Sequence, residues 1–357
     1  MRKNWASKIG FLTAMPAHSS SKLILYLCGM QQLHNFVKSM NALGEKRTPF
    51  LFVIDFDMKK PMLFPLNEIN PQDLLFELNG VSNANDIESE PLTGLDLKVS
   101  PPSEEAYEKS FTLVMKHLRR GDSYLLNLTQ PVSVKTNLGL KEIFFHSRAR
   151  YKLWIKDQFT VFSPEPFVKI ENGLISTHPM KGTIDALIPD AESRLLHDMK
   201  ELAEHYTIVD LLRNDLNMVA QKVRVEKFRY VEEIITTRGK LLQTSSLITG
   251  QLGHDALNHL GDIMLRLLPA GSVTGAPKRR TVEIIHEAEG YDRGYYTGIF
   301  GLFDGKRLDS AVMIRFVESS AAGLIFKAGG GITVNSLMVN EYKELIQKVY
   351  FPIPLYT

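Results

Sequence analysis

The chain has 357 residues, enough for one large core or two ordinary domains. Hydrophobic residues make up 44% and charged residues 23%, which is typical of a soluble globular protein. A formal net charge of +2 without a dense Lys/Arg block argues against a nucleic-acid partner. The single cysteine, Cys28, excludes an intramolecular disulfide and a cysteine-rich zinc site.

Residues 1–30 show no clear periodicity. They predict a poorly ordered extension, or a segment upstream of the true start of translation at Met30 or Met40. The apolar run from Leu23 to Cys28 spans about six residues. It is short for a signal peptide and far below the roughly 20 residues that cross a bilayer. We therefore expect a cytoplasmic protein without a membrane span.

From Thr48 onward, patterns typical of strands alternate with amphipathic helical patterns. In chain order we first expect a strand at 49–57, a polar connection at 82–102 and a helix at 103–121. Strands should follow at 123–134, 151–155, 159–163, 167–170 and 174–177, and then helices at 191–212, 257–269 and 277–290. Consecutive hairpin strands across 298–334 and a final helix at 340–350 should complete the chain's elements. Short strands in hairpins, separated by helices, predict an α+β fold with antiparallel sheets. Residues 31–357 are expected to form one domain, with its functional motifs in residues 100–350.

Two helices carry carboxylates at helical spacing. Glu201 and Glu204 lie three residues apart on one, and Glu341 and Glu344 lie three apart on the other, with Lys348 four residues further on. Residues at this spacing share one helix face. Two such faces meeting would offer oxygen ligands for Mg²⁺, which proteins hold with one or two carboxylates plus substrate oxygens. The simpler interpretation of each pair is a solvated helix face.

Lys181 lies between Pro179 and Gly182 in the stretch STHPMKGT, which predicts an extended-to-turn segment. An amine is a nucleophile only when neutral, so burial or a neighbouring cation would have to lower its pKa from about 10.4. Glu165, between two prolines in FSPEPF, could be presented into a cleft as a general acid. The simpler interpretations are a surface lysine in a loop and an exposed glutamate in a turn.

Two glycine-bearing segments could bind anions. The loop at 268–280, LPAGSVTGAPKRR, fails the spacing of a phosphate-binding loop, but the helix start that follows it could bind a carboxylate. The AGGG run at 328–331 could cradle an anion with its amides, beside Arg315 on the neighbouring strand. A tight hairpin or bulge is the alternative. Together, these groups suit a small polyanionic substrate that loses a leaving group.

Residues 100–350 resemble the chorismate-utilising enzymes, and within them the large subunits of aminodeoxychorismate synthases. The motifs that carry the resemblance are, in order, GDSYLLNLTQ, FSPEPF, HPMKGT, KELAEHYTIVDLLRNDL, PAGSVTGAPK, RGYYTGIFG, MIRF, AGGGITVNS and NEYKELIQK. Residues 48–100 match weakly and residues 1–30 do not match. The resemblance implies one α+β unit, in which two antiparallel sheets pack as a sandwich with helices outside and the site between the sheets.

The resemblance also implies roles for individual residues. Mg²⁺ would bridge Glu204, Glu344 and the ring carboxylate of chorismate, with Glu201 and Glu341 close by. Glu165 would protonate the departing 4-hydroxyl. The positions that match substrate-binding residues are Thr183, Gln243, Tyr296, Arg315, Gly329, Gly330, Gly331 and Lys348.

In this family, lysine at position 181 is typical of aminodeoxychorismate synthases, whereas anthranilate synthases usually have alanine. The implied mechanism has the Lys181 amine attack C2 as the 4-hydroxyl leaves. Ammonia then attacks C4 and expels the lysine, giving 4-amino-4-deoxychorismate, a precursor of 4-aminobenzoate and folate. Anthranilate synthase component I and a non-catalytic chorismate-binding subunit are the alternatives.

Two positions depart from the family pattern. Leu125 stands where isochorismate and salicylate synthases carry a general-base lysine and aminating relatives usually have glutamine, which disfavours direct attack by water. Gln243 stands where histidine is usual and could still hydrogen-bond a substrate oxygen. No cysteine-based glutaminase motif is present in the sequence. The resemblance therefore implies ammonia from a separate glutamine amidotransferase subunit or from solution.

Overall fold

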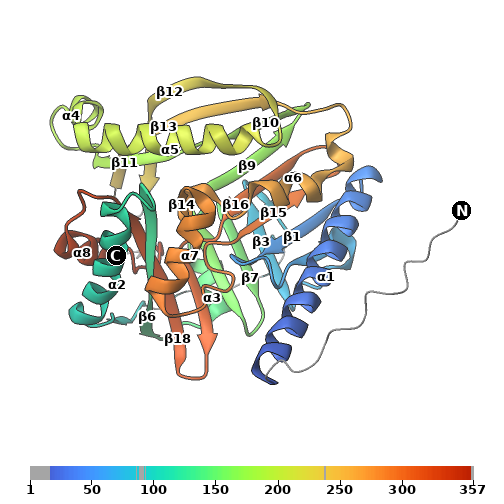
Figure 1. Ribbon diagram of the computed structural model, residues 1–357, viewed down its shortest axis with the longest axis horizontal. Coiled ribbons are helices and arrows are strands. Elements are labelled where there is room, and N and C mark those ends of the chain that lie inside the picture. The colour runs from blue at the N-terminus through green and yellow to red at the C-terminus, as the bar shows by residue number, and fades with distance from the viewer. Residues whose placement is uncertain (1–16, 86, 88–91, 93, 237–238, 355–357) are drawn as a thin grey trace, which may run out of the picture.

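The computed structural model describes residues 17–354 except 86, 88–91, 93, 237 and 238. Two nine-stranded sheets dominate the described part of the chain, and every strand pairing recorded in them is antiparallel (Figure 1). The predicted α+β class with two antiparallel sheets is therefore confirmed. Among the described residues, no helix is both long enough and apolar enough to cross a membrane.

The first sheet runs in the order β11-β13-β10-β9-β16-β15-β1-β2, and β12 pairs with β13. Its strands are β1 (Phe50–Ile54), β2 (Met62–Pro65), β9 (Pro166–Glu171), β10 (Leu174–Thr177), β11 (Met180–Asp185), β12 (Gln221–Thr236), β13 (Gly239–Gln251), β15 (Ile299–Phe303) and β16 (Leu308–Val312).

The second sheet runs in the order β14-β6-β18-β17-β8-β7-β3-β4, and β5 pairs with β6. Its strands are β3 (Leu74–Leu78), β4 (Val81–Ser82), β5 (Leu97–Ser100), β6 (Leu125–Thr136), β7 (Tyr151–Ile155), β8 (Phe159–Ser163), β14 (Gly275–Ala276), β17 (Phe316–Ser320) and β18 (Gly323–Ile332).

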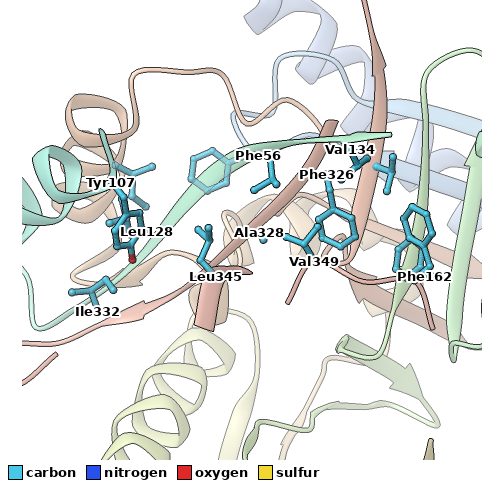
Figure 2. Close-up of a cluster of buried hydrophobic side chains, with 14 of the residues drawn as sticks. Phe56, Tyr107, Leu128, Val134, Phe162, Phe326, Ala328, Ile332, Leu345 and Val349 are labelled. Atoms are coloured by element: carbon cyan, nitrogen blue, oxygen red, sulfur yellow. The ribbon is translucent and has the colours of Figure 1, made fainter. Parts of the chain in front are cut away.

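Helices cover the outer faces of both sheets. They are α1 (Ala17–Glu45), α2 (Glu104–Arg119), α3 (Leu140–His146), α4 (Ala191–His197), α5 (Met199–Asn217), α6 (Leu260–Leu267), α7 (Lys278–Glu289) and α8 (Met338–Gln347). One apolar cluster joins the first sheet to α1, α5 and α6, and another joins the second sheet to α2, α3, α7 and α8 (Figure 2). A third cluster fills the space between the sheets, with side chains such as Val53 and Phe300 facing Leu153 and Phe316.

Three sequence predictions need correction. Residues 17–30, expected to lack order, form the first half of α1, and residues 1–16 lie outside the described residues. The single helix predicted at 191–212 is two helices, because Asp198 is extended and its carboxylate accepts the Glu201 amide at 3.0 Å as the N-cap of α5. The long β12–β13 hairpin was not predicted, because register shifts along β12 interrupt the two-residue alternation that marks a strand.

Arg293 is the most completely bonded buried charge in the fold, with a side chain only 2% exposed. Its Nε donates to Glu289 at 2.8 Å and its Nη2 donates to the same carboxylate at 2.5 Å. The remaining hydrogen bonds run to the carbonyls of Val273 and Asn127, at 2.9 and 2.6 Å, and to the Thr297 hydroxyl at 3.2 Å. One guanidinium therefore ties α7 to β6 and to the loop that follows α6.

Arg293→Met should lower the free energy of unfolding by about 3–5 kcal/mol, because it leaves the Glu289 carboxylate buried without its cation. Urea denaturation followed by circular dichroism measures the change. The control is Arg213→Met on α5, whose ion pair with Asp210 is 42% and 61% exposed and should contribute no more than about 1 kcal/mol. Equal losses in the two variants would contradict this interpretation of the buried pair.

Candidate active site

A cavity of about 530 Å³ opens where β11 of the first sheet faces β6 and β18 of the second, and α5 and α8 complete its wall. Every residue that the sequence assigned to the site lines this cavity: Glu165, Lys181, Thr183, Glu201, Glu204, Gln243, Tyr296, Arg315, Gly329, Gly330, Gly331, Glu341, Glu344 and Lys348. The structure thus brings together residues that lie up to 183 positions apart in the chain.

Lys181 lies within strand β11, opposite Thr244 of β13, and not on the surface loop that was the simpler interpretation. The strand register shifts between Lys181 and Thr183, where Gly182 has a φ of +75°. A Cβ at position 182 would lie 3.2 Å from a carboxylate oxygen of Glu201, so glycine permits both the bulge and the close approach of α5. The bulge redirects the strand at the point where Lys181 enters the cavity.

The Lys181 ammonium is paired with a carboxylate. Its Nζ lies 3.1 Å from Glu204 Oε2. Burial alone would lower the pKa of Lys181, but the carboxylates of Glu204, Glu201 and Glu344 outweigh burial, so the pKa is raised. The lowered pKa that a nucleophilic amine requires is therefore not produced by this arrangement of carboxylates, whose closeness to Lys181 the sequence did not reveal.

The four helical glutamates all line the cavity, and of these Glu341 is buried whereas Glu344 remains exposed. On α8, Lys348 Nζ lies 2.6 Å from Glu344 Oε1 and donates to the Gly329 carbonyl at 2.9 Å. A Cβ at Gly330 would lie 3.5 Å from a Glu344 oxygen and 3.6 Å from a Glu341 oxygen. The carboxylates of α8 therefore lie close to β18, at distances that a Cβ at position 330 would meet as ordinary contacts.

The carboxylates that line the cavity meet only part of what a Mg²⁺ site requires. Among the described residues, no three acidic or histidine side chains converge closely enough to hold a metal ion by themselves. Carboxylates from α5 and α8 nevertheless line one cavity, and carboxylate oxygen is the ligand that Mg²⁺ prefers. Glu204 and Glu344 could therefore hold Mg²⁺ together with oxygen atoms supplied by a ligand.

Carboxylates outnumber cations among the described residues that line the cavity. Four of the carboxylates are on α5 and α8, and the described cations are those of Lys181, Arg315 and Lys348. Burial lowers the pKa of His178, which also lines the cavity, so its imidazole adds no charge near pH 7. A small polyanion would therefore meet these carboxylates, and a divalent cation among them would offset their charge.

Glu165 lies between β8 and β9 and is half-buried, not exposed in a turn. Its Oε1 accepts a hydrogen bond from the Ser272 hydroxyl at 2.6 Å, and its backbone amide donates to the Ser163 hydroxyl at 3.1 Å. Burial raises the pKa of Glu165, although the Ser272 hydrogen bond and the nearby Lys181 ammonium oppose the rise. A carboxyl group with a raised pKa suits a general acid.

The loop at 268–280 meets the cavity at a different place from the one predicted. The residues that line the cavity are Ser272–Gly275, whereas Lys278, the first residue of α7, is paired with Asp215 at 2.9 Å. The predicted carboxylate site at the start of this helix is therefore not part of the cavity. The sequence did not single out Ser272 as a site residue. Its only signal was a hydroxyl within the glycine-bearing loop at 268–280.

Arg315 and the AGGG run, the two elements that the sequence suggested for an anion, both line the cavity. Arg315 adopts a left-handed conformation with φ of +54°, and its guanidinium lies over the Tyr350 ring, 5.4 Å from the ring centroid. The AGGG run is part of β18, not a tight hairpin: Gly329–Gly331 pair with β6, while β17 pairs with β18 only as far as Lys327. The edge of β18 beyond Lys327 therefore has a strand neighbour on one side only.

Leu125 and Gln243, the two departures from the family pattern, both line the cavity. Leu125 is 7% exposed, and its Cδ1 lies 3.2 Å from the point where a Cβ on Gly331 would be. Lys181 Nζ lies 3.9 Å from the same point, so an apolar side chain stands near the amine. Gln243 lies opposite Thr183 in the β11–β13 pairing.

The chain belongs to the family described as chorismate binding enzyme, whose model matches residues 66–354. An uncharacterised PabA-like protein of Pasteurella multocida is 52% identical over 321 residues, which cover 90% of this chain and 99% of that one. Aminodeoxychorismate synthase component 1 of Salmonella typhimurium is 34% identical over 265 residues, 68% of this chain and 56% of that protein. The crystal structure of anthranilate synthase component I from Streptococcus pneumoniae matches with a TM-score of 0.61 and 28% identity, over 75% of this chain and 61% of that one.

Proposed function

We propose that the protein is the aminating subunit of an aminodeoxychorismate synthase, which replaces the 4-hydroxyl of chorismate with ammonia to give 4-amino-4-deoxychorismate. The observation that carries the proposal is an amine, Lys181, in the same cavity as a half-buried carboxyl group, Glu165. A nucleophile and an acid on one substrate allow a displacement to be divided into two steps.

In the first step, the Lys181 ammonium loses a proton to solvent and its nitrogen forms a bond to C2 of the ring. The ring double bonds shift and the C4–O bond breaks. Glu165 supplies a proton to the departing oxygen, which leaves as water. Leu125, near the amine, offers no base that could activate water for attack on the ring instead.

In the second step, ammonia forms a bond to C4, the double bonds shift back, and the C2–N bond to Lys181 breaks. A proton from the added nitrogen passes to the departing lysine, so the amine is regenerated. The sum is chorismate plus ammonia giving 4-amino-4-deoxychorismate plus water. A separate glutamine amidotransferase subunit is the proposed source of the ammonia.

The remaining cavity residues would bind and orient the substrate. Arg315, Lys348 and the backbone at Gly329–Gly331 suit its carboxylates. Mg²⁺, held by Glu204 and Glu344 with Glu201 and Glu341 beside them, would supply positive charge for a substrate carboxylate and weaken the hold of these glutamates on the Lys181 proton. Thr183, Gln243 and Tyr296 would complete the wall around the ring.

Chorismate should bind at least roughly 10-fold more tightly in the presence of Mg²⁺, because the metal would offset the charge of the carboxylates on α5 and α8. Titration calorimetry with and without the metal measures the difference. Glu204→Gln and Glu344→Gln should lose the dependence on Mg²⁺, whereas Glu283→Gln, on the exposed side of α7, should keep it. Metal-independent binding by the wild type would contradict the proposed cation site.

The product assay tests the proposed reaction directly. Chorismate, Mg²⁺ and ammonium incubated with the protein should yield 4-amino-4-deoxychorismate without release of pyruvate, as identified by mass spectrometry. Anthranilate plus pyruvate as the main products would assign the protein to the anthranilate synthase reaction. Binding of chorismate without turnover by any ammonia source would support a non-catalytic subunit.

Lys181→Ala should reduce amination at least roughly 100-fold, because the covalent route loses its nucleophile. Lys306→Ala, in the exposed turn between β15 and β16, is the matched control and should keep full activity. Wild-type protein quenched during turnover should carry the ring mass on the peptide that contains Lys181. Unchanged turnover of the alanine variant would exclude the covalent route.

A further inference from the structure

The side chain of Glu165 is held by a residue from a distant part of the chain. Ser272, 107 positions further on, reaches across the cavity wall and donates to Oε1 at 2.6 Å. The backbone of Glu165 is fixed independently, since its amide donates to Ser163 and its carbonyl accepts the Val312 amide at 3.1 Å. Main chain and carboxyl group are therefore positioned by different elements.

The segment that carries Ser272 is itself held by two cations, the buried Arg293 and the partly buried Lys278. Arg293 donates to the carbonyl of Val273, the neighbouring residue. On the other side, Lys278 Nζ pairs with Asp215 at 2.9 Å and donates to the Leu267 carbonyl at 2.6 Å.

Asp215 also packs against Gly271, the residue before Ser272. A Cβ there would lie 2.7 Å from its Oδ2 and would not fit. The Ser272 hydroxyl is therefore delivered from a rigid turn.

We propose that Ser272 is a positioning residue for Glu165: its hydroxyl occupies Oε1 and leaves Oε2 as the oxygen that carries the acid proton toward the substrate. The inference rests on the proposed function for its catalytic consequence, but the hydrogen bond can be tested without turnover. A carboxylic acid has one proton, and a donor fixed at one oxygen directs that proton to the other. Ser272 would thus select both the orientation and the protonation site of the acid.

The groups around Glu165 determine the direction of the expected pH effect. Burial raises its pKa, and the hydrogen bond from Ser272 lowers it, as do the charges of Lys181 on β11, Arg315 before β17 and Lys348 after α8. Tyr296 also faces Glu165 and remains protonated near neutral pH, because burial raises its pKa. Removing the Ser272 hydroxyl should therefore raise the pKa of Glu165 further.

The test follows the Glu165 carboxyl carbon by NMR titration of protein labelled with ¹³C-glutamate, with the signal assigned by its loss in Glu165→Gln. Ser272→Ala should move the titration midpoint to higher pH, and Ser272→Thr should restore it. Ser320→Ala removes a hydroxyl that donates to Gly323 in the β17–β18 turn and should leave the midpoint unchanged. If the alanine variant does not fold, Ser272→Cys provides a weaker donor and should shift the midpoint in the same direction.

Steady-state kinetics provide a second test of the role of Ser272. Ser272→Ala should lower kcat by roughly 10- to 100-fold with little change in KM, because the acid is misplaced while the binding groups remain. The alkaline limb of the kcat profile should move to higher pH, since the acid keeps its proton longer. An unchanged NMR midpoint, or a limb that does not move, overturns the positioning role. If the wild type does not aminate chorismate, the proposed function fails and the NMR midpoint alone decides the role of Ser272.

Discussion

Arg293 uses all five of its N–H groups, and the site depends on where those bonds lead. Two reach the Glu289 carboxylate, and the others reach the carbonyls of Val273 and Asn127 and the Thr297 hydroxyl. A buried guanidinium is tolerated only when every donor is satisfied, so the three segments that supply these acceptors must be in place together. Two of them, at Asn127 and Val273, form part of the cavity wall.

The cavity is therefore built at a junction, and its precision comes from backbone groups fixed by buried charges. The Arg293 and Lys278 bonds fix the loop on either side of Ser272, whose hydroxyl in turn holds Glu165. Lys181 has a different kind of support, from a bulge in β11 that requires glycine at position 182. Glu165 and Lys181 are thus positioned by independent structural elements.

Most of the fold could be predicted from local periodicity, whereas the membership of the cavity followed mainly from the resemblance of the ordered motifs to a known family. Glu201 and Glu204 could be assigned to one helix face from their spacing alone. Long-range packing has no such signal, so the contact between Ser272 and Glu165 was missed. For the same reason, the sequence did not reveal that carboxylates of α5 and α8 surround Lys181 closely enough to raise its pKa, where burial alone would lower it.

The raised pKa of Lys181 links the nucleophile to the cation site. The carboxylates that hold a proton on the amine, chiefly that of Glu204 at 3.1 Å, are the same groups that would attract a divalent cation. Any positive charge placed among them lowers the pKa of Lys181, and any proton kept on Lys181 weakens the attraction for a cation. Protonation of Lys181 and binding of a cation must therefore be coupled, because each disfavours the other. In the proposed mechanism, Lys181 would therefore stay protonated among the glutamates until a cation binds, and its amine would become reactive only in that state.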